Sequence, residues 1–405
     1  MQAIVMTETG GPEVLVAREV PVPDPGAGEV LIRAEAVPVL YPETLLRSGV
    51  FPMAVDLPAV FGFQAAGEVV EIGAGADPSL LGRRVVVETA GAGSYAEFVR
   101  AAAHAATPIP EGVSADDAAA AVMSGSVAIA LLKSARLTGT ETVLVQAGAT
   151  GVGSYLVQLA GQFGAARVIA TAGDAAKRER ARELGAAEVL DHRDEHWTDT
   201  LRTVLGDATI DVVFDSLGGS SAARLLDAMT PGSGRMLSYG WLSGTPAQVS
   251  ASDLLPRGLT LIGCAGPAWL AGLAPHRAEI LERVHALAPA VETTLPLEDA
   301  AKAHELVESR APLGKIILRP ARTGSGRTAR RGVDISTTGR EFRSACPRPV
   351  DGSLRDQRHA LADDRLVRQR SSRKKYGSAS PRMSITPSSA SSSSRRKWSM
   401  IGRWS

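Results

Sequence analysis

Short apolar runs separated by glycine and proline dominate the first 120 residues of the chain. Runs of strand length occur at residues 3–7, 29–36, 67–72 and 84–88, with turn-rich segments such as VPVPDPGAGEV between them. Short strands bounded by turn residues are typical of all-β structure. This part therefore predicts an irregular β-barrel rather than an alternation of strands and helices.

The pattern changes at about residue 116. The alanine-rich segment DDAAAAVMSGSVAIALLKSA predicts a helix, for which Ser114 and Asp116 are candidate caps. Apolar runs of strand length then alternate with helical patterns such as AAKRERARELGA. These runs lie at residues 142–146, 167–171, 188–190, 210–215, 235–238 and 259–263. Such alternation predicts a doubly wound parallel sheet, and right-handed crossovers predict the strand order 3-2-1-4-5-6.

Residues 266–320 return to a mixed pattern. The segment PLEDAAKAHELVES predicts an amphipathic helix, and GKIILRP predicts a final strand. We expect this segment to rejoin the first domain. The predicted organisation is a β-barrel domain of residues 1–122 and 266–320, and a parallel-sheet domain of residues 123–265.

The first predicted parallel strand leads into the glycine-rich turn AGATGVG. A strand, a glycine turn, a helix and a second strand within about 30 residues form the context of dinucleotide binding. Glycines let the backbone approach a pyrophosphate, and the helix points free N–H groups at it. The alternative is a tight turn without a ligand. The candidate cofactor-binding residues here are Thr150, Gly151, Val152 and Gly153.

Composition limits the class of protein and its location but does not identify a function. The 405 residues are 44% hydrophobic and 21% charged, an ordinary make-up for a soluble protein. No apolar run of membrane-spanning length free of charges and glycines is present, and the N-terminus MQAIVMTETGG lacks a signal-like apolar core. We therefore expect a cytoplasmic protein that does not contact a membrane. Two cysteines exclude a disulfide framework and a cysteine-rich zinc site.

Charge divides the chain into two parts. Residues 321–405 hold 20 Lys and Arg against 6 Asp and Glu, whereas residues 1–320 hold 24 against 37. The basic tail has few large apolar residues, so we predict that it is disordered. It is either an anion- or nucleic-acid-binding arm or an extension without a selected role, from a fusion or a shifted reading frame. The absence of interleaved aromatic residues favours the second interpretation, which makes nucleic acid an unlikely partner.

A series of motifs in residues 1–320 resembles a known family. The motifs are MQAIVMTETGGPEVL, VPDPGAGEVLIRAEAV, RSGVFP, GFQAAGEVVEIGAGA, AGATGVGSYLVQLA, KRERARELGAAEVLDHRDE, DVVFDSLGG, PLEDAAKAHELVESR and GKIILRP. The family is the zinc-independent medium-chain dehydrogenase/reductases, in the branch of the NADPH:quinone oxidoreductases. The resemblance implies a GroES-like barrel that carries catalysis, a Rossmann domain and a homodimer.

Several positions depart from the family pattern, and all of them lose polarity. The departures are Leu40 for Asn, Phe61-Gly62 for Pro-Gly, Gln64 for Glu, Val127-Ala128 for Thr-Ala, and Phe51 for the Tyr of related enoyl reductases. They leave the cofactor fold intact and put the catalytic chemistry in question.

The end of the second parallel strand predicts which cofactor is used. An NAD-preferring enzyme usually has Asp or Glu there, and this chain has Thr171-Ala172-Gly173. Lys177 and Arg178 at the start of the next helix can pair with a 2′-phosphate, and the resemblance places His192 near the same group. We therefore expect NADPH, with Asp174 as the opposing signal. The resemblance places the nicotinamide beside Ser216, Leu217, Tyr239, Gly240, Cys264, Ala265 and Gly266.

The predicted chemistry follows from the absence of zinc ligands. A zinc alcohol dehydrogenase would need a thiolate or imidazole near Leu40 and a histidine at Phe63, both of which are apolar here. Without a Lewis acid, the expected substrate is a small, flat, hydrophobic quinone or enone, whose oxyanion is delocalised and can take its proton from solvent. Tyr41 is the best remaining hydroxyl donor and our candidate catalytic residue. The predicted substrate pocket comprises Leu40, Phe51, Phe61, Val127, Trp241 and Trp269.

Two other functions stay open. An enoyl-thioester reductase would need a basic docking patch, and the acidic body disfavours it. A protein that binds NADPH without turnover would fit the lost polarity at Leu40, Phe51 and Val127.

Overall fold

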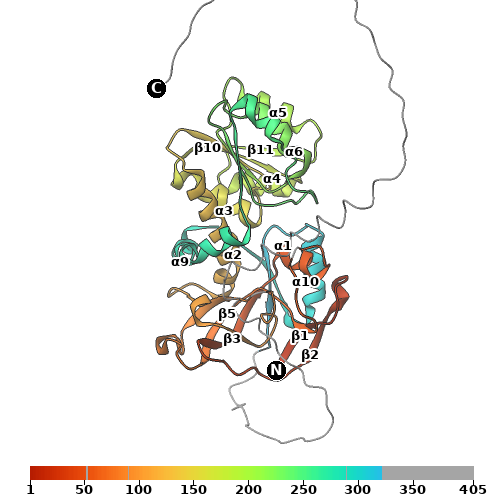
Figure 1. Ribbon diagram of the computed structural model, residues 1–405, viewed down its shortest axis with the longest axis vertical. Helices are drawn as coiled ribbons and strands as arrows, with labels where there is room; N and C mark the ends of the chain where they lie inside the picture. The colour runs from red at the N-terminus through yellow and green to blue at the C-terminus, as the bar shows by residue number, and fades with distance from the viewer. Residues whose placement is uncertain (52, 90, 289, 322–405) are drawn as a thin grey trace, which may run out of the picture. The chain divides into compact units, whose positions relative to one another are not determined.

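The computed structural model describes residues 1–51, 53–89, 91–288 and 290–321 (Figure 1). All of them belong to one compact unit. Apart from Ala321, the tail on which we predicted disorder lies outside the described residues.

The first part of the chain forms the predicted barrel-like β-structure. A three-stranded sheet has the order β2-β1-β4, and a larger sheet has the order β15-β16-β3-β5-β6-β8, with β7 paired to β3. The strands are β1 (Gln2–Met6), β2 (Leu15–Glu19), β3 (Glu29–Pro38), β4 (Ala59–Val60), β5 (Gln64–Ile72), β6 (Arg84–Glu88), β7 (Phe98–Ala102), β8 (Thr107–Pro108), β15 (Val291–Pro296) and β16 (Lys315–Arg319).

The C-terminal segment returns to this sheet, as its pattern predicted. β16 pairs antiparallel with β3 through Ile317 and Leu318, and β15 lies parallel to β16. The blue strands and helix α10 (Ala300–Glu308) accordingly lie among the red and orange elements in Figure 1, near α1 (Tyr41–Arg47). α8 (Pro267–Leu270) and α9 (Ala274–Arg283) precede them, and α9 packs against α2 (Ala115–Ala135).

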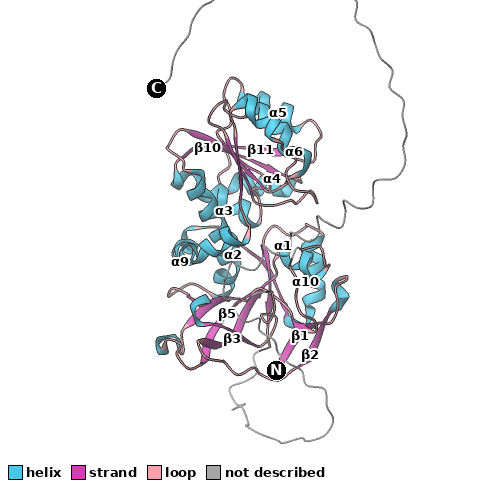
Figure 2. Cartoon of the chain, in the orientation of Figure 1, coloured by secondary structure: helices cyan, strands magenta, loops and turns pink. Residues whose placement is uncertain are grey.

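The middle of the chain forms a six-stranded parallel sheet in the predicted order, β11-β10-β9-β12-β13-β14. Its strands are β9 (Glu141–Val145), β10 (Ala165–Ala172), β11 (Glu188–Asp191), β12 (Val212–Asp215), β13 (Arg235–Ser238) and β14 (Thr260–Gly263). Its helices are α3 (Gly151–Leu159), α4 (Ala175–Glu183), α5 (Trp197–Leu205), α6 (Gly219–Leu225) and α7 (Ala251–Leu254) (Figure 2).

Both faces of this sheet are covered. Val143 and Val145 of β9 belong to a core with α2 and α3, whereas Leu144 between them belongs to a second core with α5 and α6. Alternate side chains of a strand point to opposite faces, so one apolar run serves both layers. This explains why the predicted strands read as continuous rather than alternating apolar runs.

Helix α2 joins the two parts of the chain and is mostly buried. Ser114 caps it by accepting the N–H of Asp117 at 3.0 Å, while Asp116 pairs with Arg319. Among the described helices, α2 alone is long and apolar enough to cross a membrane, and most of it lies inside the protein. The predicted domain boundary at residues 122–123 falls within this helix, and the boundaries stay a prediction.

Candidate dinucleotide and substrate site

The glycine turn between β9 and α3 is built for close backbone packing. A Cβ at position 153 would lie 2.2 Å from the carbonyl oxygen of Ala147, so only glycine fits there. Gly151 has a φ of +54°, in the left-handed region that favours glycine. Thr150 precedes the helix, and no side chain caps the first turn of α3. Its N–H groups are therefore free of side-chain partners and suit an anion.

Thr171 and His192 meet beyond this turn, at the ends of β10 and β11. The Thr171 hydroxyl accepts the N–H of Ala147 at 3.2 Å and lies 2.9 Å from His192 Nδ1. When the hydroxyl donates its proton to Nδ1, the ring proton lies on Nε2, which is beside Gly173. Burial lowers the pKa of His192 to about 4, so the ring is neutral at pH 7. In that tautomer the ring presents one N–H donor where a 2′-phosphate is expected.

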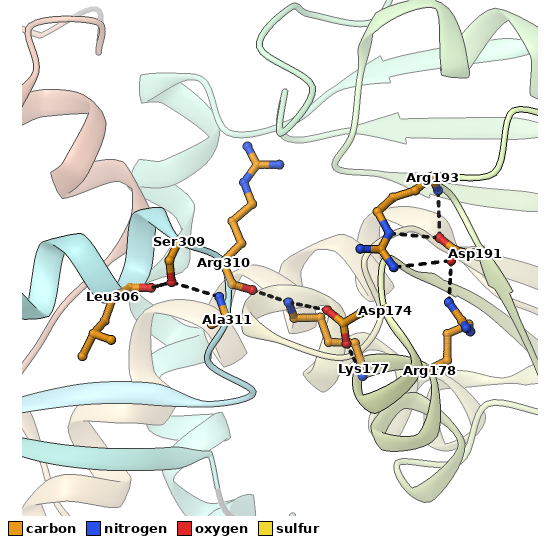
Figure 3. A network of polar contacts seen from close by, with 9 residues as sticks. All are labelled: Asp174, Lys177, Arg178, Asp191, Arg193, Leu306, Ser309, Arg310 and Ala311. Atoms are coloured by element: carbon orange, nitrogen blue, oxygen red, sulfur yellow. Dashed lines mark hydrogen bonds and ion pairs between the residues drawn. The ribbon is translucent and has the colours of Figure 1, made fainter.

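Lys177 lies at the same edge of the sheet. Its ammonium group lies 3.0 Å from a carboxylate oxygen of Asp174 and also donates to the carbonyl oxygen of Arg310 (Figure 3). An ammonium group has three N–H donors, so one remains for a phosphate. The Asp174 carboxylate, our opposing signal, accepts the N–H of Lys177 at 2.8 Å and caps α4.

The sequence reasoning missed two arginines near Lys177, namely Arg193 and Arg310. Arg193 lies over Gly173, because a Cβ there would be 3.3 Å from its Cδ and Nε. Arg193 and Arg178 share the carboxylate of Asp191, as Figure 3 shows. Arg193 follows His192 directly in the sequence, so the motif that pointed to His192 could also have identified Arg193. Arg310 comes from the turn after α10, and no local signal connects it to Lys177.

The predicted nicotinamide residues follow three strands that end in register. Asp215, Ser238 and Gly263 pair across β12, β13 and β14, so the residues after them share one edge of the sheet. These residues are Ser216, Leu217, Tyr239, Gly240, Cys264, Ala265 and Gly266.

Hydrogen bonds to Gln146 and close packing at Gly240 hold this edge in place. Ser216 Oγ donates to the carbonyl oxygen of Gln146 at 3.1 Å, and the Leu217 N–H lies 3.3 Å from the side-chain oxygen of Gln146. A Cβ at position 240 would lie 3.1 Å from the carbonyl oxygen of Ser216. Burial raises the pKa of the Cys264 thiol to about 11, so the thiol is neutral at pH 7.

The predicted substrate residues differ in exposure. Leu40, Phe61 and Val127 are buried, and the Phe61 ring packs edge-on against Tyr95 in the barrel core, with ring centroids 5.4 Å apart. Trp241 is exposed, whereas Phe51 and Trp269 are half-buried. The side chains that offer surface to a substrate are therefore Phe51, Trp241 and Trp269.

Arg310 brings Tyr41 together with the turn that carries Trp241. One guanidinium nitrogen lies 3.5 Å from the Tyr41 hydroxyl and 2.8 Å from the carbonyl oxygen of Leu242. Tyr41 is the first residue of α1, half-buried, with its ring 6.0 Å from the guanidinium carbon. In the described part of the chain, no three His, Cys, Asp or Glu side chains are grouped to hold a metal ion.

Comparisons with known proteins match both parts of the chain. Residues 151–280 match the family model described as zinc-binding dehydrogenase, and residues 26–111 match the alcohol dehydrogenase GroES-like domain. The chain is 32% identical to quinone oxidoreductase 1 of Escherichia coli, over 77% of this chain and 97% of that protein. It is 32% identical to 2-haloacrylate reductase of a Burkholderia species, over 79% of this chain and 99% of that protein. The structure of the Escherichia coli quinone oxidoreductase complexed with NADPH superimposes with a TM-score of 0.72 at 31% identity, covering 79% of this chain and all of that one.

Proposed function

The chain belongs to the medium-chain dehydrogenase/reductase superfamily, in its quinone oxidoreductase branch, and from this we propose that it is a zinc-independent oxidoreductase that uses NADPH to reduce a quinone or conjugated enone. The printed names of the relatives support this class of acceptor. A quinone and a 2-haloacrylate each carry a double bond conjugated to a carbonyl or carboxyl group. The predicted homodimer and cytoplasmic location stay predictions.

The preference for NADPH rests on the group at the ends of β10 and β11. Lys177 supplies an ammonium N–H, the neutral His192 ring can supply an N–H in one tautomer, and no carboxylate stands at residues 171–173. Arg193 and Arg310 add positive charge nearby, and both guanidinium groups contribute to the lowered pKa of His192. Charge-assisted hydrogen bonds of this kind favour a phosphate over the ribose hydroxyl of NADH. This cationic group is the observation that carries the proposed function.

The pyrophosphate fits the turn at the start of α3. Position 153 leaves room only for a hydrogen atom beside Ala147, and the N–H groups that follow Thr150 have no side-chain cap. We assign Thr150, Gly151, Val152 and Gly153 to this contact.

The remaining residues orient the acceptor. When bound, NADPH supplies a hydride to the conjugated system, and the reduced acceptor takes a proton from solvent. The aromatic side chains of Phe51, Trp241 and Trp269 offer flat apolar surface, and Tyr41 offers a hydroxyl that Arg310 links to the turn carrying Trp241. Orientation and exclusion of water are the protein's contribution to the rate.

An acceptor panel tests the proposal. Purified protein is assayed for NADPH and NADH oxidation with 1,4-benzoquinone, 9,10-phenanthrenequinone, 2-cyclohexenone, 2-chloroacrylate and crotonyl-coenzyme A. We expect turnover with NADPH and the quinones or the enone, and little with NADH. Fastest turnover of the thioester would instead identify an enoyl-thioester reductase. Tight NADPH binding without oxidation by any acceptor would identify a binding protein.

A further inference from the structure

Glu43 is a fully buried carboxylate at the start of α1, two residues after Tyr41. Its two oxygens accept three hydrogen bonds from three separate segments. One oxygen accepts the N–H of Leu40 at 2.7 Å and the hydroxyl of Tyr95 at 2.7 Å, and the other accepts the N–H of Phe63 at 2.7 Å. Glu43 therefore links the start of α1 to the turn before β5.

Resting on the proposed function, we propose that Glu43 is a positioning residue that holds the two barrel segments of the acceptor site in register. The start of α1 carries Tyr41, and Phe63 in the second segment packs edge-on against Phe51 with ring centroids 6.4 Å apart. Since Tyr41 and Phe51 are the barrel residues assigned to the acceptor, the spacing of their segments sets the width available to a flat ring.

Tyr95 supports both sides of this link. Gly62 has a φ of +107°, and a Cβ there would lie 2.2 Å from both Ser94 Oγ and the Tyr95 ring. The turn before β5 is therefore pressed against the tyrosine whose hydroxyl is bonded to Glu43. A carboxylate with three good partners is held in a single geometry, because a buried donor or acceptor that loses its partner is left desolvated without compensation.

The same contacts exclude a proton relay to the acceptor through Glu43. The carboxylate is bonded to Tyr95, whose hydroxyl lies 3.1 Å from His304 Nε2 on the far side, in the barrel core. Both Glu43 and Tyr95 are completely buried. The Tyr41 hydroxyl is bonded to Arg310 instead. Glu43 therefore acts through the backbone it holds and not by contact with the acceptor.

The electrostatic surroundings of Glu43 make this role sensitive to pH. Burial raises the pKa of Glu43 to about 7, against the opposing effects of its hydrogen-bond donors and of Lys315 on β16. The other titratable groups around it are the neutral Tyr95 and His304, and Arg47, which pairs with Glu308. The carboxylate accepts all three hydrogen bonds, whereas the protonated acid gives up one acceptor position. The acceptor KM should thus rise as the pH falls through about 7.

The test compares Glu43→Gln with Glu141→Gln. A glutamine at position 43 keeps the shape but must turn its NH₂ group toward an N–H donor in either orientation. Glu141 is the matched control, because it is a buried carboxylate that accepts the N–H groups of Thr138 at 2.8 Å and Gly139 at 3.2 Å in another part of the molecule. Each variant is assayed below its own melting temperature, so that only folded protein contributes.

Four measurements decide the outcome. We expect Glu43→Gln to raise the KM for 9,10-phenanthrenequinone at least fivefold at pH 8, to leave the NADPH Kd within twofold, and to abolish the rise in KM that the wild type shows between pH 8 and pH 6. Quinone binding without NADPH, followed by quenching of tryptophan fluorescence, should weaken by a similar factor. Glu141→Gln should lower the melting temperature and change none of these.

Equal kinetic parameters for the two variants and the wild type would overturn the positioning role and leave Glu43 as a stabilising residue. Loss of NADPH affinity in Glu43→Gln would overturn it as well. If none of the acceptors in the panel supports NADPH oxidation by the wild type, the proposed function fails. The quenching comparison still decides the role of Glu43.

Discussion

At the scale of single residues, the cofactor preference depends on one ammonium group with a free N–H. Replacing Lys177 by Met keeps most of the aliphatic stem and removes the donor to the phosphate. Because hydrogen bonds to charged groups contribute about 1.5–3 kcal/mol, we expect the NADPH Kd to rise about 10- to 100-fold and the NADH Kd to change little. Fluorescence titration with both cofactors measures this. Lys133→Met, which breaks a surface pair with Glu279, is the control. Equal weakening of NADH binding would refute the assignment.

A second residue-scale prediction concerns acid stability. Burial lowers the pKa of His304 to about 3, from about 6.5 in an unfolded chain. The unfolded state therefore takes up a proton before the folded state does, and stability that is complete above pH 6.5 declines as the pH falls toward 3. At about 1.4 kcal/mol per pH unit, this residue accounts for about 2 kcal/mol between pH 6.5 and pH 5.

Urea unfolding at pH 7 and pH 5 checks this contribution. The loss of unfolding free energy in acid should be smaller in His304→Gln than in the wild type by about 2 kcal/mol. His104→Gln, at an exposed histidine, should behave like the wild type. An unchanged acid loss in His304→Gln would contradict the prediction, whatever the variant's stability at pH 7.

At the scale of elements, sequence patterns predicted the parts whose signals are local. Apolar runs alternating with helices were enough to predict the order of the parallel sheet, and AGATGVG located the start of α3. The contact of Arg310 with Lys177 joins residues 133 positions apart, and neither segment carries a pattern that points to the other. Glu43 was missed because a single carboxylate in a short helix is usually exposed to solvent. Only the fold buries it, through its hydrogen bonds with Phe63 and Tyr95.

The start of α3 provides an element-scale prediction. A Cβ in Gly153→Ala would meet the carbonyl oxygen of Ala147 at 2.2 Å, so the helix must move away from β9. Overpacking of this kind costs about 1–3 kcal/mol, and it displaces the N–H groups assigned to the pyrophosphate. We expect a lower melting temperature and NADPH and NADH affinities that both fall at least tenfold.

Gly161→Ala is the matched control for that variant. Gly161 follows α3 in a short helical turn, and a Cβ there meets nothing within 4 Å. This substitution should leave cofactor binding unchanged and stabilise the fold slightly, by about 0.4–1 kcal/mol. Cofactor affinities in Gly153→Ala equal to those of Gly161→Ala would show that the glycine turn does not contact the nucleotide.

At the scale of the whole molecule, charge divides the chain into two parts. Residues 1–320 are acidic and contain both segments that match family models, residues 26–111 and 151–280, and 77% of this chain covers 97% of the length of quinone oxidoreductase 1. Residues 321–405 carry 20 Lys and Arg against 6 Asp and Glu. The described fold closes with β16, whose partner strands β3 and β15 both precede it in the chain.

Truncation after Ala321 should therefore leave catalysis intact. We expect kcat and KM for NADPH and for a quinone within twofold of the full chain, and an unchanged melting temperature, because the assigned site and the barrel sheet lie within residues 1–320. A fivefold loss of kcat/KM would show that the tail contributes to the enzyme.

The truncated protein is acidic, so any binding of the full chain to a 30-nucleotide RNA should vanish with the tail. Binding that disappears on truncation and weakens steeply between 50 and about 200 mM salt would establish the tail as a polyanion-binding arm, whereas no binding by the full chain supports an extension without that role.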